Sequence, residues 1–184
     1  MAKLISKIYG DALFNLAHEE LRIDEISEEL KVLSNVLREN QDFIKILNHP
    51  RVTKEEKINI LESVFKNRFS DELVGFLTII LNNGRFGDLE SIISYYMKRV
   101  KEFKYIGVVD VISAMELTHV QKTDIESKIL QTTNFNTLEI DYTIDHSLLG
   151  GMIIKIGDQV MDSSVRTKLL LLEKNLLNVQ LTEY

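Results

Sequence analysis

The sequence predicts a helical domain followed by a small α+β domain. Apolar residues in positions 1–104 recur every three or four residues, as on one face of a helix, whereas β-branched residues alternate with polar ones from Gly107 onward. The charge balance changes at the same place: residues 1–104 hold 16 basic and 17 acidic side chains, and residues 105–184 hold 6 and 11. We therefore predict an N-terminal six-helix bundle over 1–105 and, over 106–184, an α+β domain with a mixed sheet and a C-terminal helix.

In the first domain, six segments show helical spacing of apolar residues. Pro50 ends the third helix, because proline has no N–H to donate. Thr53 and Glu56 form a capping box at the start of the fourth. Ser70 is expected to cap the fifth helix, and Gly84 to supply the left-handed residue that ends it. The predicted helices are about 3–20, 24–38, a short one across 43–47, one that follows Thr53, then 71–82 and 89–104.

The second domain alternates strands and helices. A strand is predicted within 107–114, and Thr118 with Gln121 forms a second capping box that opens a helix. Residues 137–144 alternate polar and apolar side chains without a break, which is typical of a strand with one solvent-facing side. The remaining elements are strands at 151–156 and 159–161, joined by a turn at Gly157 and Asp158, and a leucine-rich helix from Ser163 or Ser164 to about Asn178.

Length and composition restrict the class of protein. The chain has 184 residues, 45% of them apolar, which suffices to bury a core without cross-links. It has no cysteine, which excludes disulfides and cysteine-bound metals. The net charge of −6 argues against nucleic acid as a partner, because such binding depends on neutralising phosphates. No apolar run approaches the roughly 18 residues of a membrane span, and the N-terminus lacks a secretory signal, so we expect a cytosolic chain.

No pattern for catalysis or cofactor binding is found. Phosphate-loop, dinucleotide-binding, zinc-protease and hydrolase motifs are all absent. The four histidines are too far apart in sequence to form a helical metal-binding pair. Asp145, His146 and Ser147 have the residue types of a hydrolase triad, but three adjacent residues cannot converge as a triad must. We therefore expect no active site, no cofactor and no metal site.

Several helices carry more apolar surface than one contact requires. In the fifth helix the apolar side chains fill an arc of about 160°, wider than the stripe of about 100° on an ordinary amphipathic helix, and Ile79 lies outside even that arc. Phe14 lies roughly opposite the main stripe of the first helix. Leu170 and Leu177 form a second stripe on the last helix, about 120° from the first. Two interpretations remain open: fully central helices, or faces that receive amphipathic helices of partners.

Short motifs follow one another along nearly the whole chain. They are Tyr9–Phe14 (YGDALF), His49–Val52 (HPRV), Asn83–Arg85 (NGR), Asp110–Ala114 (DVISA), Asp145–Gly151 (DHSLLGG), Gly157–Asp158 and Asp162–Arg166 (DSSVR). Each motif alone is weak, but the ordered set resembles the delta subunit of bacterial F-type ATP synthase, the counterpart of the mitochondrial oligomycin-sensitivity-conferring protein. His146 and Ser163 stand where many relatives carry proline or glycine.

This resemblance implies a non-catalytic subunit of the peripheral stalk at the cytoplasmic face of the bacterial inner membrane. The helical domain would hold N-terminal segments of the alpha subunits on top of the catalytic head. The smaller domain would contact the C-terminal end of the b-type stalk subunit. Such a joint holds the head still against the torque of the rotor during ATP synthesis. Distributed contacts of the helix-in-groove kind suit that task.

Residue roles also follow from the resemblance. The family's alpha-binding groove lies between the first and fifth helices, whose corresponding residues here are Tyr9, Ala12, Phe76 and Ile79. On the last helix, Leu170 and Leu177 are the predicted stalk contacts.

The motif that begins at Asp145 is interpreted as structural. We expect Gly150, Gly151 and Gly157 to serve backbone geometry where strand, hairpin and helix meet. We expect Arg166 to pair with Asp162 or Asp158 and so to pin the hairpin to the last helix.

Two other classes of protein remain as alternatives. A small enzyme with a pocket between the domains would need a convergent polar cluster, which the sequence does not offer. A self-associating helical scaffold or regulator would use the same apolar faces to bind copies of itself.

Overall fold

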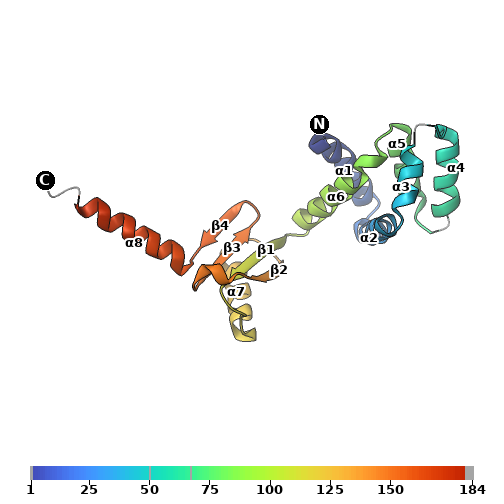
Figure 1. Ribbon diagram of the computed structural model, residues 1–184. Coiled ribbons are helices and arrows are strands. Elements are labelled where there is room, and N and C mark those ends of the chain that lie inside the picture. The colour runs from blue at the N-terminus through green and yellow to red at the C-terminus, as the bar shows by residue number, and fades with distance from the viewer. Residues whose placement is uncertain (1, 50, 67, 181–184) are drawn as a thin grey trace. The chain divides into compact units, whose positions relative to one another are not determined.

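The computed structural model describes the backbone of residues 2–49, 51–66 and 68–180 and the side chains of residues 4–49, 51–66 and 68–174. The chain separates into two compact units, Met1–Val100 and Lys101–Tyr184. Figure 1 shows helices in the first and a sheet with helices in the second. The chain is thus an α+β protein with N-terminal helices, as the sequence predicts.

The first unit packs helices around one apolar core. Its largest fully buried side chains include Tyr96, Phe65 and Leu13, which come from three different helices. Each contributes one face to the shared core, so the helices stabilise one another through burial rather than through intrinsic propensity. The helices are α1 (Ala2–Glu19), α2 (Ile23–Glu39), α3 (Gln41–Asn48), α4 (Lys54–Phe65), α5 (Asp71–Asn82) and α6 (Leu89–Phe103), with a short 3-10 helix, η1 (Phe86–Asp88), before α6.

Local signals fix where these helices begin and end. Thr53 and Glu56 form the predicted capping box at α4, each side chain satisfying a free N–H of the other's backbone. Gly84 follows α5 with φ +66°, as predicted. Ser70 precedes α5, but its side chain does not cap the helix. Its backbone N–H and hydroxyl instead donate to the Glu29 carboxylate, at 3.0 and 2.6 Å, which ties α5 to α2.

The second unit is built on a four-stranded mixed sheet with the strand order β2-β1-β3-β4. Strands β1 and β2 are parallel and are joined through α7, whereas β3 pairs antiparallel with both β1 and β4. A tight turn at Gly157 joins β3 to β4. The elements are β1 (Ile106–Ser113), α7 (His119–Thr132), β2 (Thr137–Ile144), η2 (His146–Leu148), β3 (Met152–Ile156), β4 (Gln159–Asp162) and α8 (Val165–Gln180).

The core of the second unit lies between the sheet and α7. Val109 and Val111 of β1 are fully buried, and Ile125 and Ile129 of α7 pack against them. Alternate residues of β1 are buried, as expected for a sheet with one covered face. The capping box of Thr118 and Gln121 at the start of α7 is formed. In Figure 1, α8 runs away from the sheet rather than over it.

Candidate functional site

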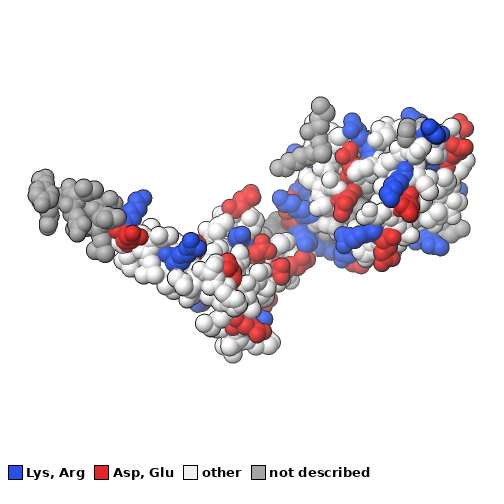
Figure 2. Space-filling model, viewed as in Figure 1, with Lys and Arg blue, Asp and Glu red and all other residues white. Residues whose placement is uncertain are grey.

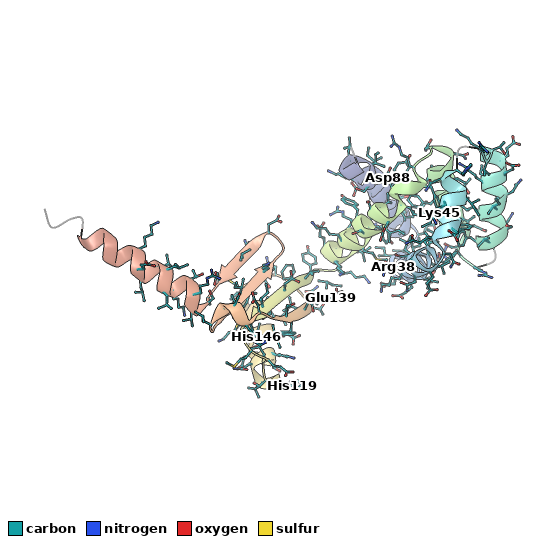
Figure 3. All side chains as sticks on the ribbon, in the orientation of Figure 1. Arg38, Lys45, Asp88, His119, Glu139 and His146 are labelled. Carbon is teal, nitrogen blue, oxygen red and sulfur yellow. The ribbon has the colours of Figure 1, made fainter. Side chains whose placement is uncertain are left out.

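Among the described residues, no group of three or more histidine or carboxylate side chains is placed to hold a metal ion. The triad-like residues make their hydrogen bonds mainly to backbone groups. The Asp145 carboxylate accepts a hydrogen bond from the Ser147 backbone N–H at 2.9 Å, and His146 Nδ1 lies 3.1 Å from the Ala114 carbonyl oxygen. Figure 3 shows His119 and His146 as separate side chains of the second unit. These residues therefore shape a turn.

The helical unit contains an open cavity of about 230 Å³ between α2, α3, η1 and α6. Its floor is largely apolar and includes Leu37, Phe86 and Ile93. The charged residues that line it are Arg38, which Figure 3 labels, and Glu90. The lining has no histidine, and Glu90 is its one carboxylate.

The residues predicted at the alpha-binding groove lie on α1 and α5. The rings of Tyr9 and Phe76 meet edge to face, with centroids 6.4 Å apart and planes at 70°. The Asn83 amide donates to the Tyr9 hydroxyl at 3.0 Å, and this bond joins the end of α5 to α1. Tyr9 and Phe76 are half-buried, whereas Ala12 and Ile79 are exposed. The structure thus brings Tyr9 and Phe76 together and leaves the other two open to solvent.

Exposed apolar side chains extend this area along α1. Leu4 and Ile8 are 63% and 58% exposed, and Ile79 on α5 is 55% exposed. At about 100° per residue, Leu4 and Ile8 continue the side of α1 that carries Tyr9 and Ala12. Ile8 is exposed because α1 turns Leu13 and Ala17 toward the core instead. We name Tyr9, Ala12, Phe76 and Ile79 with Leu4 and Ile8 the α1/α5 surface.

Phe14 does not belong to any spare surface. It is only 6% exposed, so its assignment to excess apolar surface is wrong. Its ring lies 6.4 Å from that of Tyr96, and the Arg99 guanidinium sits 5.5 Å above it. Both partners come from α6, which covers the side of α1 opposite its main apolar stripe.

Helix α8 presents leucines that the chain itself does not cover. Leu170, a predicted stalk contact, is 56% exposed, and its neighbours Leu169, Leu171 and Leu172 are 54%, 56% and 58% exposed. The side chain of Leu177, the other predicted contact, lies outside the described residues. Figure 2 shows mostly uncharged surface on the described part of α8, with few charged side chains between.

The start of α8 is held by the Asp162 carboxylate. It accepts hydrogen bonds from the Ser164 backbone N–H at 2.8 Å and the Thr167 hydroxyl at 2.7 Å. These bonds favour the charged form, so the pKa of Asp162 lies below its ordinary value, with the Ser164 backbone N–H as the largest cause. The Val165 N–H donates to the Gly150 carbonyl at 2.9 Å. We call these contacts the α8 root.

The predicted ion pair of Arg166 is not formed. Arg166 is exposed, and within the described residues it makes no ion pair with Asp158 or Asp162. The carboxylate of Asp162 is already used by backbone and hydroxyl donors. The pKa of Asp145 lies below its ordinary value, and the largest cause is the hydrogen bond from the Ser147 backbone N–H. The charge of Arg166 acts on Asp145 at longer range and is the smallest of the causes that lower this pKa.

Comparison with protein-family models matches residues 5–176 to the family described as ATP synthase delta (OSCP) subunit. The chain belongs to this family. The resemblance predicted from the ordered motifs is therefore confirmed. We interpret the α1/α5 surface and α8 as surfaces of a member of the ATP synthase delta family.

Curated relatives in the delta family match along almost their whole length. The ATP synthase subunit delta of Lachnoclostridium phytofermentans is 49% identical over 181 residues, covering 98% of this chain and 100% of the relative. That of Brevibacillus brevis is 32% identical over 169 residues, covering 92% and 96%. A chain of the Toxoplasma gondii mitochondrial ATP synthase hexamer, solved by cryo-electron microscopy, superposes with a TM-score of 0.68 at 20% identity, covering 94% and 97%. This structural likeness shows the fold.

Family membership also confirms the interpretation of the chain as a structural, non-catalytic subunit of a rotary ATP synthase. In the part of the chain that the structure describes, none of the helices has both the length and the apolar character needed to cross a bilayer.

Proposed function

We propose that this chain joins the catalytic head of an F-type ATP synthase to its peripheral stalk. Residues 1–105 act as a six-helix bundle that binds N-terminal segments of the alpha subunits, and residues 106–184 bind the C-terminal end of the b-type subunit. The complex holds the chain at the cytoplasmic face of the bacterial inner membrane. One observation carries the proposal: a member of this family leaves apolar side chains exposed in both units, at the α1/α5 surface and on α8.

The α1/α5 surface has the features of a site for an amphipathic helix. Ile8 and Ile79 provide exposed apolar anchors, and Ala12 is small enough to let a partner helix approach closely. Tyr9 and Phe76 form an aromatic base whose edge-to-face contact is already made. These two rings are already in contact before binding. The protein therefore loses less side-chain freedom when a partner helix binds to it.

The other end of the tether is α8. Leu170 is more than half exposed on a helix that the rest of its unit does not cover. Leu177 follows it by seven residues, which places both on one side of a helix. We propose this side as a contact with the b-type subunit.

The alpha-binding role can be tested with the full-length chain and a synthetic peptide of the alpha-subunit N-terminus from the same organism. Ile79→Ser removes an exposed apolar anchor and is expected to weaken binding at least tenfold, about 1.4 kcal/mol, by isothermal titration calorimetry. Val32→Ser is the matched control, because Val32 is 53% exposed on α2, a helix that contributes no residue to this surface. Equal affinity of the Ile79→Ser and Val32→Ser variants would contradict the assignment.

The same exposed surfaces could hold copies of the chain together, which is the self-associating alternative. Light scattering separates the two functions. The proposal expects a mass near 21.3 kDa for the chain alone and a larger mass when alpha peptide or a soluble b-subunit fragment is added. A stable homo-oligomer that binds neither partner would favour the alternative.

A further inference from the structure

Two glycines lie inside the α-helices of the described residues, Gly10 in α1 and Gly75 in α5. The chain itself explains the first, because a Cβ on Gly10 would lie 2.4 Å from the Tyr95 ring. At Gly75 no neighbouring atom lies within 4 Å of the place where a Cβ would be, and the backbone is not left-handed. Neither packing within the chain nor backbone conformation therefore requires glycine at position 75.

A glycine in the middle of a helix lowers the stability of that helix. Its backbone loses more conformational freedom on folding than that of any other residue, so alanine in its place would stabilise the helix. Gly75 is the fifth of the 12 residues of α5, so it does not act as a cap at either end. No contact within the chain offsets this loss of stability. Residues that lower stability in this way often serve function instead.

Gly75 lies on the side of α5 that faces away from the core. At about 100° per residue it is about 160° from Leu73 and Leu77, which are both fully buried. By the same count it is only about 40° from Ile79. Gly75 is exposed, and Ile79, one turn further along the helix, is 55% exposed. Gly75 therefore borders the α1/α5 surface.

The missing side chain leaves a hollow next to Ile79. Side chains on a helix tilt toward its N-terminus, so Ile79 leans toward the turn that contains Gly75. With no Cβ at Gly75, the backbone of α5 is open beside the Ile79 side chain. A partner helix that packs on Ile79 can place an apolar side chain against this backbone. Because the distance between packed helices depends on the side chains at their contact, the partner can approach α5 closely here.

From these observations we propose that Gly75 sets how closely a partner helix approaches the α1/α5 surface. The hollow at Gly75 receives an apolar side chain of that helix, and a larger residue at position 75 would push the helix away from Ile79. The inference rests on the proposed alpha-binding function of the first unit. It adds a residue that determines which helix fits, and it places the close contact one turn before Ile79.

Two substitutions in the full-length chain test this role with the alpha-subunit peptide. Gly75→Ala and Gly75→Leu fill the hollow to different extents, and both introduce a better helix former, so both should raise the midpoint of thermal unfolding. Isothermal titration calorimetry should nevertheless show weaker binding of the peptide, by at least about fivefold for alanine and about fiftyfold for leucine. If the partner does not approach Gly75, the added apolar surface of leucine would leave binding unchanged or make it tighter.

Asn35→Ala is the matched control for helix stability. Asn35 is exposed on α2, a helix that contributes no residue to the α1/α5 surface, and alanine is the better helix former there as well. This variant should also unfold at a higher temperature, and it should bind the peptide as the parent chain does. It therefore separates a gain in helix stability from a change at the surface.

A double-mutant cycle identifies the partner's side of the contact. Each apolar residue of the peptide is replaced singly by alanine, and every peptide is titrated against the parent chain and against the Gly75→Leu variant. One replacement should cost less affinity with the variant than with the parent chain, because the contact is already lost in the variant. Equal costs in both chains at every peptide position would overturn the inference.

The possible results separate this inference from the function on which it rests. Stabilised Gly75 variants that bind the peptide as the parent chain does, or more tightly, overturn the role of Gly75 and leave alpha binding intact. Lower thermal stability of Gly75→Ala overturns that role too, because the chain itself would then need the space. If the parent chain does not bind the peptide, or if Ile79→Ser binds it as Val32→Ser does, the proposed function fails, and this inference fails with it.

Discussion

Among single residues, Gly151 is under the tightest steric restriction at the α8 root. Its φ is +80°, and a Cβ at this position would lie 2.5 Å from the Ser163 carbonyl oxygen and 2.9 Å from the Ser164 Cα. Gly157 has a similar conformation, with φ +57°, but no atom lies within 4 Å of the place where its Cβ would be. The two glycines therefore separate the cost of a left-handed backbone from the cost of a steric clash.

We expect Gly157→Ala to lower the free energy of unfolding by about 1 kcal/mol, the cost of a left-handed conformation for an ordinary residue. Gly151→Ala adds a clash with rigid backbone and should cost at least about twice as much. Urea unfolding of both variants, followed by circular dichroism, measures the difference. Equal losses would show that the chain next to Gly151 yields easily and that the α8 root is loose.

The sequence predicts the roles of some residues correctly and the roles of others wrongly. It identifies the glycines of the 150–157 region as positions of special backbone geometry, because glycine alone adopts such conformations freely. It pairs Arg166 with Asp162 or Asp158, because opposite charges close together in the sequence are expected to attract each other. That pairing is wrong. The structure shows that the Asp162 carboxylate is already occupied by donors within five residues, one of them a backbone N–H. Backbone donors leave no trace in a charge pattern, so this outcome could not be read from the sequence.

At the scale of elements, bounds follow the sequence wherever a local signal fixes them. The fifth helix is predicted at 71–82 and occurs there, between Ser70 and the left-handed Gly84. The strand at 137–144 also has its predicted bounds. Which face of a helix is covered depends instead on its neighbours in space. Phe14 is buried because α6 packs on that side of α1, and no periodicity within α1 could show it.

The contact of α1 with α6 depends on a glycine, which allows a test at this scale. A Cβ on Gly10 would lie 2.4 Å from the Tyr95 ring, whereas one on Gly75 in α5 would meet nothing within 4 Å. We expect Gly75→Ala to raise the free energy of unfolding by about 0.5–1 kcal/mol, because alanine is the better helix former. Gly10→Ala gains the same propensity but must displace Tyr95, so it should destabilise by about 1–3 kcal/mol. Thermal unfolding of the two variants shows whether each substitution raises or lowers the free energy of unfolding. Stabilisation by Gly10→Ala would show that α1 and α6 separate readily.

For the whole molecule, two separate cores serve one mechanical role. Within the described residues, one apolar cluster lies among the helices of the first unit, and the other lies between the sheet and α7 in the second. Each unit carries one of the exposed apolar surfaces, so the proposed tether has a binding end in each unit. Two joints in one tether act in series, and the weaker one sets the torque at which the head slips.

A series arrangement predicts how variants combine. In membrane vesicles with an imposed proton gradient, Ile79→Ser should reduce ATP synthesis severalfold through the head joint, and Leu170→Ser with Leu177→Ser should do so through the stalk joint. The combined variant should be no worse than the more impaired of the two, because once one joint slips the other no longer carries the full torque. ATP hydrolysis should persist in all of them, and Val32→Ser, exposed on α2, should behave as the parent chain. Multiplied losses in the combined variant would mean that the two surfaces act independently rather than as the two ends of one tether.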